Sequence, residues 1–245
     1  MGSFVLMERN LTKQAFPQTR WSLVMSAGDD ESCEELCRIY WRPIYGFLRK
    51  SGHARENAED LTQSFFARVL KDGSFLSAEK EKGRLRSFLL GALKRHVIDF
   101  RRAEGRVKRG SGVEHFSLAT SELDFDDAEN YYASQPVEEQ TPDKVFDQAW
   151  LLALLARTHE RIAKDYRKAG RELEYLLLKE GLVTAGEIDR KDVSEKLKVA
   201  PATVGVLLHR LRQNFRGAMR DEIAETVGSR AEVDEELAYL MNVFS

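Results

Sequence analysis

The stretch LRSFLLGALKRHVIDFRR, residues 85–102, has the strongest periodicity in the chain. Its apolar residues recur every three or four positions, which is the spacing of an amphipathic helix. Basic residues occupy the opposite face at the same spacing: Lys94, Arg95, Arg101 and Arg102. A basic stripe of this length matches the phosphates along a nucleic-acid backbone. The stretch therefore predicts a helix with one buried face and one basic face.

Helical spacing also predicts the elements on either side of this stretch. Only 16 Gly and 5 Pro occur in 245 residues, which favours long helices over a turn-dense β-sandwich. Thr141 and Pro142 are a typical N-cap and first helical residue. Helices are expected at about 33–48, 55–71, 85–102, 142–162, 171–180, 193–198 and from 201 onward. The sequence thus predicts an all-α fold.

The net charge of −2 conceals separate basic and acidic blocks. Residues 82–109 carry ten bases and two acids, and residues 190–220 carry eight bases and two acids. Between them, residues 114–147 carry ten acids and one base. Two basic blocks suggest two polyanion-binding units. Charge alone leaves open the alternative that long helices simply carry solvated faces.

The blocks suggest two helical domains joined by a linker. We expect an extension at 1–15, a first domain at 16–110, a flexible acidic linker at 111–140, a second domain at 141–227 and an acidic tail at 228–245. The linker could fold back over a basic face and compete with DNA, or act as an inert tether. Phe125 and the pair Tyr131-Tyr132 could dock or be solvated. The tail is either regulatory or a frayed helix.

The second basic block predicts a helix-turn-helix unit. Asp192 would cap a short helix at 193–198, and Pro201 would start a long helix after a tight turn. The exposed candidates on the long helix divide into base readers and phosphate contacts. The base readers would be Thr203, His209 and Arg210, and the phosphate contacts Arg212, Gln213 and Arg216. Many helical pairs that do not bind DNA share this pattern.

Other classes of protein find little support. No apolar run approaches the roughly 18 residues of a membrane span, and residues 1–13 do not resemble a secretory signal. Two cysteines, Cys33 and Cys37, cannot form a disulfide framework or a four-ligand zinc site. There is no phosphate loop, HExxH motif or nucleophile elbow. We therefore expect a cytoplasmic protein without catalytic residues, metal or cofactor.

Several stretches, taken in order, resemble the sigma-70 family, specifically the extracytoplasmic-function (group IV) sigma factors of bacterial RNA polymerase. AEDLTQSFF at 58–66 is similar to the polymerase-binding helix of that family. Residues 86–102 resemble the promoter −10 segment, and VGVLLHRLR at 204–212 resembles the −35 recognition helix. FPQTRWSLV at 16–24 and RDEIAETV at 220–227 resemble one branch of the family. The resemblance covers about 16–110 and 141–227.

The resemblance implies a promoter-specificity subunit without catalysis of its own, whose partners are core RNA polymerase, promoter DNA and a possible anti-sigma factor. Polymerase would be bound by Glu59, Asp60, Leu61, Gln63 and Phe66, and the −10 element by Arg84, Arg86, Lys94, Arg95, Arg101 and Arg102. The loop at 72–84, which contains Phe75, is where the family captures an extruded base.

The chain departs from the family pattern at four positions. Phe88 stands where Trp is usual, Arg95 where Asn is usual, Lys198 at the turn Gly and Ala200 at the polar N-cap. Loss of that cap costs about 1 kcal/mol of helix stability. Two other interpretations of the function remain. The protein could be a helix-turn-helix regulator that never binds polymerase, or an all-α interaction adaptor, which the basic stripe disfavours.

Overall fold

The computed structural model describes residues 30–71, 84–107, 125–133, 140–182 and 188–243. Within these ranges the protein is entirely helical, which confirms the predicted fold class. The α-helices are α2 (Asp30–Lys50), α3 (Arg55–Lys71), α5 (Leu85–Val107), α6 (Phe125–Ala133), α7 (Pro142–Lys168), α8 (Glu172–Leu178), α9 (Arg190–Leu197), α10 (Pro201–Ala224) and α11 (Glu232–Asn242), and Lys179–Leu182 form a 3₁₀ turn. No described helix is long and apolar enough to cross a membrane.

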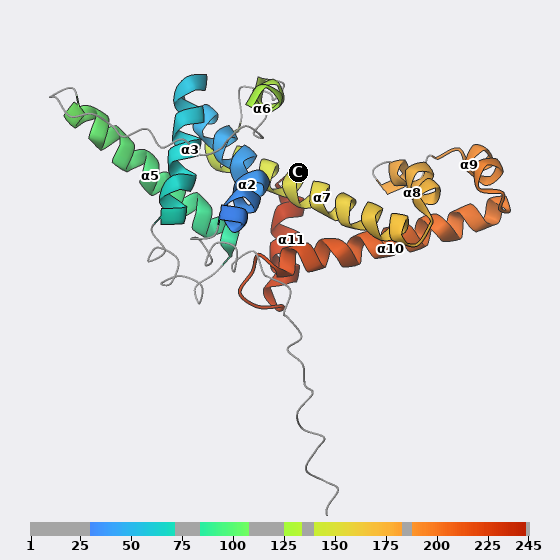
Figure 1. Cartoon of the computed structure of the whole chain (residues 1–245). Helices are drawn as coiled ribbons and strands as arrows, with labels where there is room; N and C mark the ends of the chain where they lie inside the picture. The colour runs from blue at the N-terminus through green and yellow to red at the C-terminus, as the bar shows by residue number, and fades with distance from the viewer. Residues whose placement is uncertain (1–29, 72–83, 108–124, 134–139, 183–187, 244–245) are drawn as a thin grey trace, which may run out of the picture.

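Two long helices connect the ends of the molecule. α7 has 27 residues and α10 has 24, so each is roughly 35–40 Å long at 1.5 Å per residue. They run side by side, with α2, α3, α5, α6 and α11 near one end and α8 and α9 near the other (Figure 1). The α7–α10 pair thus holds the basic face of α5 and the start of α10 at a distance from each other.

The larger hydrophobic core lies among α2, α3, α5, the first half of α7, the end of α10 and α11. Tyr40 of α2 stacks on Trp150 of α7, with ring centroids 4.4 Å apart. Trp150 and Phe146 are fully buried there. The core therefore crosses from the predicted first domain into the predicted second one, and the division of the chain at residues 110 and 141 stays a prediction.

The smaller core lies among the second half of α7, α8, α9 and the first half of α10. Leu178, Val204 and Leu211 are fully buried in it, and Val193 nearly so. This packing holds α9 against α10, as the helix-turn-helix pattern predicts. The predicted start of α9 is wrong by three residues. Asp189, rather than Asp192, caps the helix and accepts hydrogen bonds from the backbone N–H groups of Lys191 and Asp192.

Other helix ends follow the sequence signals. α3 has the predicted bounds, and Gly52 follows α2 with a φ of +88°, a conformation that glycine adopts without strain. The Thr141 hydroxyl accepts a hydrogen bond from the Lys144 N–H at 3.2 Å, so the predicted cap of α7 is confirmed. Lys198, at the end of α9, is left-handed with φ 55°.

Two segments are more ordered than predicted. Residues 125–133 were expected within a flexible acidic linker, but they form α6, because Phe125 and Ala128 pack against the larger core. Residues 232–242 of the predicted tail form α11, which buries Val233 and Leu240. The predicted extension at 1–15, the motif at 16–24 and residues 72–83 of the loop with Phe75 lie outside the described residues.

Candidate nucleic-acid and polymerase interfaces

The outer face of α5 carries the basic stripe. Lys94, Arg95, Arg101 and Arg102 are all exposed, as predicted. The Lys94 ammonium group lies 2.6 Å from the Asp143 carboxylate, and both side chains are nearly half exposed. Exposed ion pairs contribute about 0–1 kcal/mol and are screened by salt. A nucleic-acid phosphate can therefore replace Asp143 at little cost.

A cavity of about 300 Å³ lies beside this stripe, between α3 and α5. Three arginines line it, Arg68, Arg95 and Arg102, together with one acid, Asp99. Arg68 and Asp99 form an ion pair at 2.8 Å. The excess of guanidinium groups gives the cavity a positive potential, which favours an anionic ligand such as a phosphate group.

His96 lies between this cavity and the core and adds no positive charge. Burial and, to a smaller extent, the neighbouring Arg68 lower its pKa from 6.5 to about 4, although Asp99 acts in the opposite direction. Its Nε2 atom lies 3.0 Å from the Ser64 hydroxyl. The imidazole is therefore neutral near pH 7. The predicted place of His96 on the apolar side of the helix agrees with this environment.

Two of the arginines predicted to bind the −10 element form ion pairs with acidic residues of the same chain. Arg86 is 6% exposed and donates to Glu236 and to Asp147, both at 2.7 Å. Its guanidinium also lies 4.2 Å from the ring centre of Tyr239. Arg84 forms ion pairs with Glu235 at 2.8 Å and Glu236 at 3.1 Å.

Arg86 therefore joins α5 to α7 and α11 inside the protein, contrary to the prediction, whereas Arg84, with a side chain 25% exposed, joins the start of α5 to α11 and its contact with the −10 element stays a prediction. Their acidic partners lie 61 to 152 positions away along the chain. Periodicity within one helix cannot reveal such a contact. The basic stripe that remains for DNA begins at Lys94, about two turns further along α5.

The predicted polymerase-binding residues of α3 fall into an exposed group and a buried group. Asp60 is exposed, and Glu59 and Gln63 are partly exposed. Leu61 and Phe66 are at most 1% exposed and belong to the larger core. They hold α3 in place and offer no surface to a partner, contrary to the prediction that they supply apolar contact. The accessible part of this surface is polar, and Glu59 accepts a hydrogen bond from Arg55 at 2.8 Å.

The predicted recognition helix is the first half of α10. His209, Arg210, Gln213 and Arg216 are exposed, and Thr203 is partly exposed. Arg212 differs from the prediction. Its guanidinium donates two hydrogen bonds to the Gly181 carbonyl, at 3.1 and 2.8 Å, and so fastens α10 to the 3₁₀ turn. Arg212 is therefore committed to a contact within the protein.

The turn between α9 and α10 closes without the usual glycine and polar cap. Ala200 has no side-chain cap, and Thr203 donates its N–H to the Ala200 carbonyl at 2.8 Å. The Ser194 hydroxyl donates to the Val199 carbonyl at 2.7 Å, and the Val199 N–H donates to the Ser194 carbonyl at 3.1 Å. These bonds fix the turn despite the left-handed Lys198.

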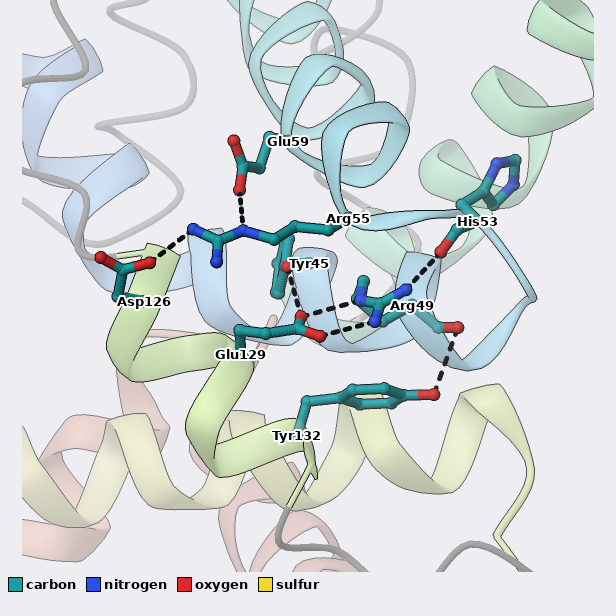
Figure 2. A network of polar contacts seen from close by, with 8 residues as sticks. All are labelled: Tyr45, Arg49, His53, Arg55, Glu59, Asp126, Glu129 and Tyr132. Atoms are coloured by element: carbon teal, nitrogen blue, oxygen red, sulfur yellow. Dashed lines mark hydrogen bonds and ion pairs between the residues drawn. The ribbon is translucent and has the colours of Figure 1, made fainter.

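Sequence reasoning missed a polar network between α6, α2 and α3 (Figure 2). Glu129 of α6 accepts hydrogen bonds from the Arg49 guanidinium at 2.5 and 2.8 Å and from the Tyr45 hydroxyl at 2.6 Å. The hydrogen bonds from Arg49 lower the pKa of Glu129 below its ordinary value. Burial, reinforced by the bond to Glu129, raises the pKa of Tyr45. The spacing of Phe125, Glu129 and Tyr132 was the available signal.

Comparison with known families bears on the part of the chain that contains α2, α3 and α5. Residues 36–107 match the family model for Sigma-70 region 2. This part of the chain is therefore similar to region 2 of the sigma-70 family. Neither the curated proteins nor the solved structures gave a match to this chain. Among the described residues, no cluster of His, Cys, Asp and Glu could hold a metal ion.

Proposed function

We propose that the protein is an alternative sigma factor of the extracytoplasmic-function subfamily, which binds core RNA polymerase and recognises the −10 and −35 elements of its promoters. The observation that carries the proposal is the match to Sigma-70 region 2 over a helical unit whose α5 exposes a basic face. The protein has no catalytic role of its own and requires no cofactor. Its place of action is the cytoplasm, and an anti-sigma factor is a candidate partner.

Polymerase binding is assigned to the exposed side of α3. Glu59, Asp60 and Gln63 offer carboxylate and amide groups to basic side chains of the polymerase. Leu61 and Phe66 act indirectly, because their burial fixes the orientation of α3 on α2 and α5. Charged groups on a rigid helix favour fast, salt-dependent association with a surface of opposite charge.

Promoter binding is assigned to two separate surfaces. Lys94, Arg95, Arg101 and Arg102 contact the backbone of the −10 element, since a row of cations neutralises successive phosphates. The first half of α10 enters the major groove at the −35 element. On this helix Thr203, His209 and Arg210 read base edges, while Gln213 and Arg216, just beyond its midpoint, contact phosphates.

Charge reversal on α3 tests this function. Asp60→Lys, alone and with Glu59→Lys, should abolish co-purification with core polymerase, while the circular dichroism spectrum stays unchanged. The single variant is needed because Glu59 also binds Arg55. Glu160→Lys with Asp165→Lys reverses two exposed acids of α7 and is the matched control. Retention of polymerase by folded Asp60→Lys and by the double variant would reject the assignment of α3.

A further inference from the structure

α6 packs across the surface of α2 next to the start of α3 (Figure 2). The Phe125 ring lies 5.1 Å from the Trp41 ring in an edge-to-face arrangement and 5.4 Å from the Tyr45 ring. Ala128 is 5% exposed and lies in the same core. One side of α6 is thus an apolar contact that fixes where the helix sits.

The polar contacts of α6 are centred on Arg49. Besides the bidentate pair with Glu129, the Arg49 guanidinium lies 5.0 Å from the ring centre of Tyr132. The Tyr132 hydroxyl donates to the Arg49 carbonyl at 3.3 Å. Arg49 and Glu129 are each only about one-fifth exposed. Planar, partly desolvated pairs of this kind are the stronger class of ion pair, so α6 is held by a specific contact.

The clasp, defined as α6 with its contacts to Tyr45, Arg49 and Arg55, reaches the proposed polymerase-binding surface through one residue. Arg55 donates to Glu59 at 2.8 Å and to Asp126 of α6 at 2.5 Å. Both acids therefore hold the same guanidinium group, and Asp126 keeps Arg55 in position against Glu59. A basic group of the polymerase that binds Glu59 must first displace Arg55.

We propose that the clasp is autoinhibitory: α6 docked on α2 and α3 blocks the Glu59 surface, and core polymerase binds after α6 is released. This inference rests on the proposed function of α3. It assigns the acids of α6 to competition with polymerase, which differs from the sequence-based hypothesis that the acidic segment covers a DNA-binding face.

The structure gives a reason why the clasp is reversible. A helix of nine residues is too short to be stable by itself, so α6 loses its structure when its contacts are lost. The Arg55–Asp126 pair is exposed, with 79% of the Asp126 side chain accessible, and is therefore weak and sensitive to salt. Without α6, Arg55 keeps only an exposed pair with Glu59 on the same helix.

Release should raise the apparent affinity for polymerase. When only a fraction of molecules is competent to bind, the apparent dissociation constant exceeds the intrinsic one by the inverse of that fraction. A clasp closed in nine molecules out of ten predicts a gain of about tenfold on release. Added salt should reduce the difference between the parent and the released variants, because it weakens the clasp of the parent.

Two kinds of variant of the full chain test the proposal. Asp126→Asn with Glu129→Gln removes the polar contacts, and Phe125→Ser removes the apolar contact without changing the charge. Asp192→Asn is the matched control, because it breaks an ion pair with Lys196 far from α6. Hydrogen exchange of the amides of residues 125–133 reports release, and a titration with labelled core polymerase reports affinity.

We expect both release variants to exchange rapidly over residues 125–133 and to bind polymerase about tenfold more tightly than the parent, while Asp192→Asn matches the parent. Rapid exchange with unchanged polymerase affinity would overturn the clasp and leave the proposed function intact. Slow exchange in both variants would show that these contacts do not hold α6 in place, and this result would also overturn the proposed clasp. Failure of the parent and all variants to bind polymerase would overturn the proposed function, and the clasp with it.

Discussion

Replacement of Arg86 tests the finding that this residue is structural rather than a DNA contact. Its guanidinium lies between two carboxylates, Asp147 on α7 and Glu236 on α11, which are 4% and 1% exposed. Arg86→Leu keeps an apolar stem but leaves buried Asp147 with the hydrogen bond from the Tyr239 hydroxyl and no cation, while Glu236 keeps its ion pair with Arg84. Because a buried charge without a partner is costly, the variant should be strongly destabilised.

The expected loss follows from these contacts. Removing one partner of a buried ion pair costs about 3–5 kcal/mol, and because Glu236 keeps its pair with Arg84, we expect the lower part of that range, about 3 kcal/mol. For a chain of this size, each kcal/mol lowers the melting temperature by about 2–4 °C. Arg86→Leu should therefore lower it by roughly 6–12 °C at pH 7.

Urea unfolding followed by circular dichroism measures the loss, and Arg101→Leu is the matched control. Arg101 lies on the same helix but is exposed, so its replacement should change the free energy of unfolding by about 0.5 kcal/mol or less. The triple variant Arg86→Leu, Asp147→Asn, Glu236→Gln should recover part of the stability, because no buried charge remains. The reasoning is refuted if Arg86→Leu unfolds like the parent and binds promoter DNA more weakly.

Three further predictions concern single residues. Lys198→Gly should stabilise the protein by about 0.5–1 kcal/mol in urea unfolding, because φ at this position is 55° and glycine adopts that conformation without strain; no gain would show that Lys198 is not strained. The folded-state pKa of His96 is about 4, below its ordinary value of 6.5, so the unfolded chain takes up the proton first as the pH falls. Stability should therefore be complete above pH 6.5 and fall by roughly 3 kcal/mol on descent to pH 4; a His96→Gln variant with the same pH profile would contradict this. Arg210→Ala should weaken binding to the cognate −35 duplex by about 1–3 kcal/mol and relax one base position, whereas Arg216→Ala should weaken all duplexes alike and lower the salt slope by about one; identical behaviour across a panel of substituted duplexes would reject the division.

Most of the fold could be predicted from local patterns. The bounds of α3, the cap of α7 at Thr141 and the start of α10 at Pro201 depend on neighbouring residues, and the structure agrees with each. The same holds for the exposed basic stripe that begins at Lys94. In these cases the deciding interactions lie within about four residues of one another, which is the range that periodicity and capping rules describe.

The errors concern contacts between distant segments. Arg86 has the sequence features of a basic-stripe residue, and its buried role depends on Asp147 and Glu236. Arg212 likewise has the position of a phosphate contact, but its guanidinium donates hydrogen bonds to the Gly181 carbonyl. Composition correctly marked residues 111–140 as acidic, yet it could not show that Phe125 packs on Trp41 and orders α6. Contacts between distant segments determine the roles of these two arginines and the ordering of α6.

Run-off transcription with purified core RNA polymerase tests the central claim most directly. The protein is added to core enzyme and a pool of promoter-bearing DNA fragments, and the transcripts are mapped to their start sites. Our account predicts that transcripts start at defined positions only when the protein is present, and that Asp60→Lys abolishes them while the protein still binds a −35 duplex. Binding to DNA without any association with polymerase, and without transcripts, would contradict the account and indicate a helix-turn-helix regulator instead.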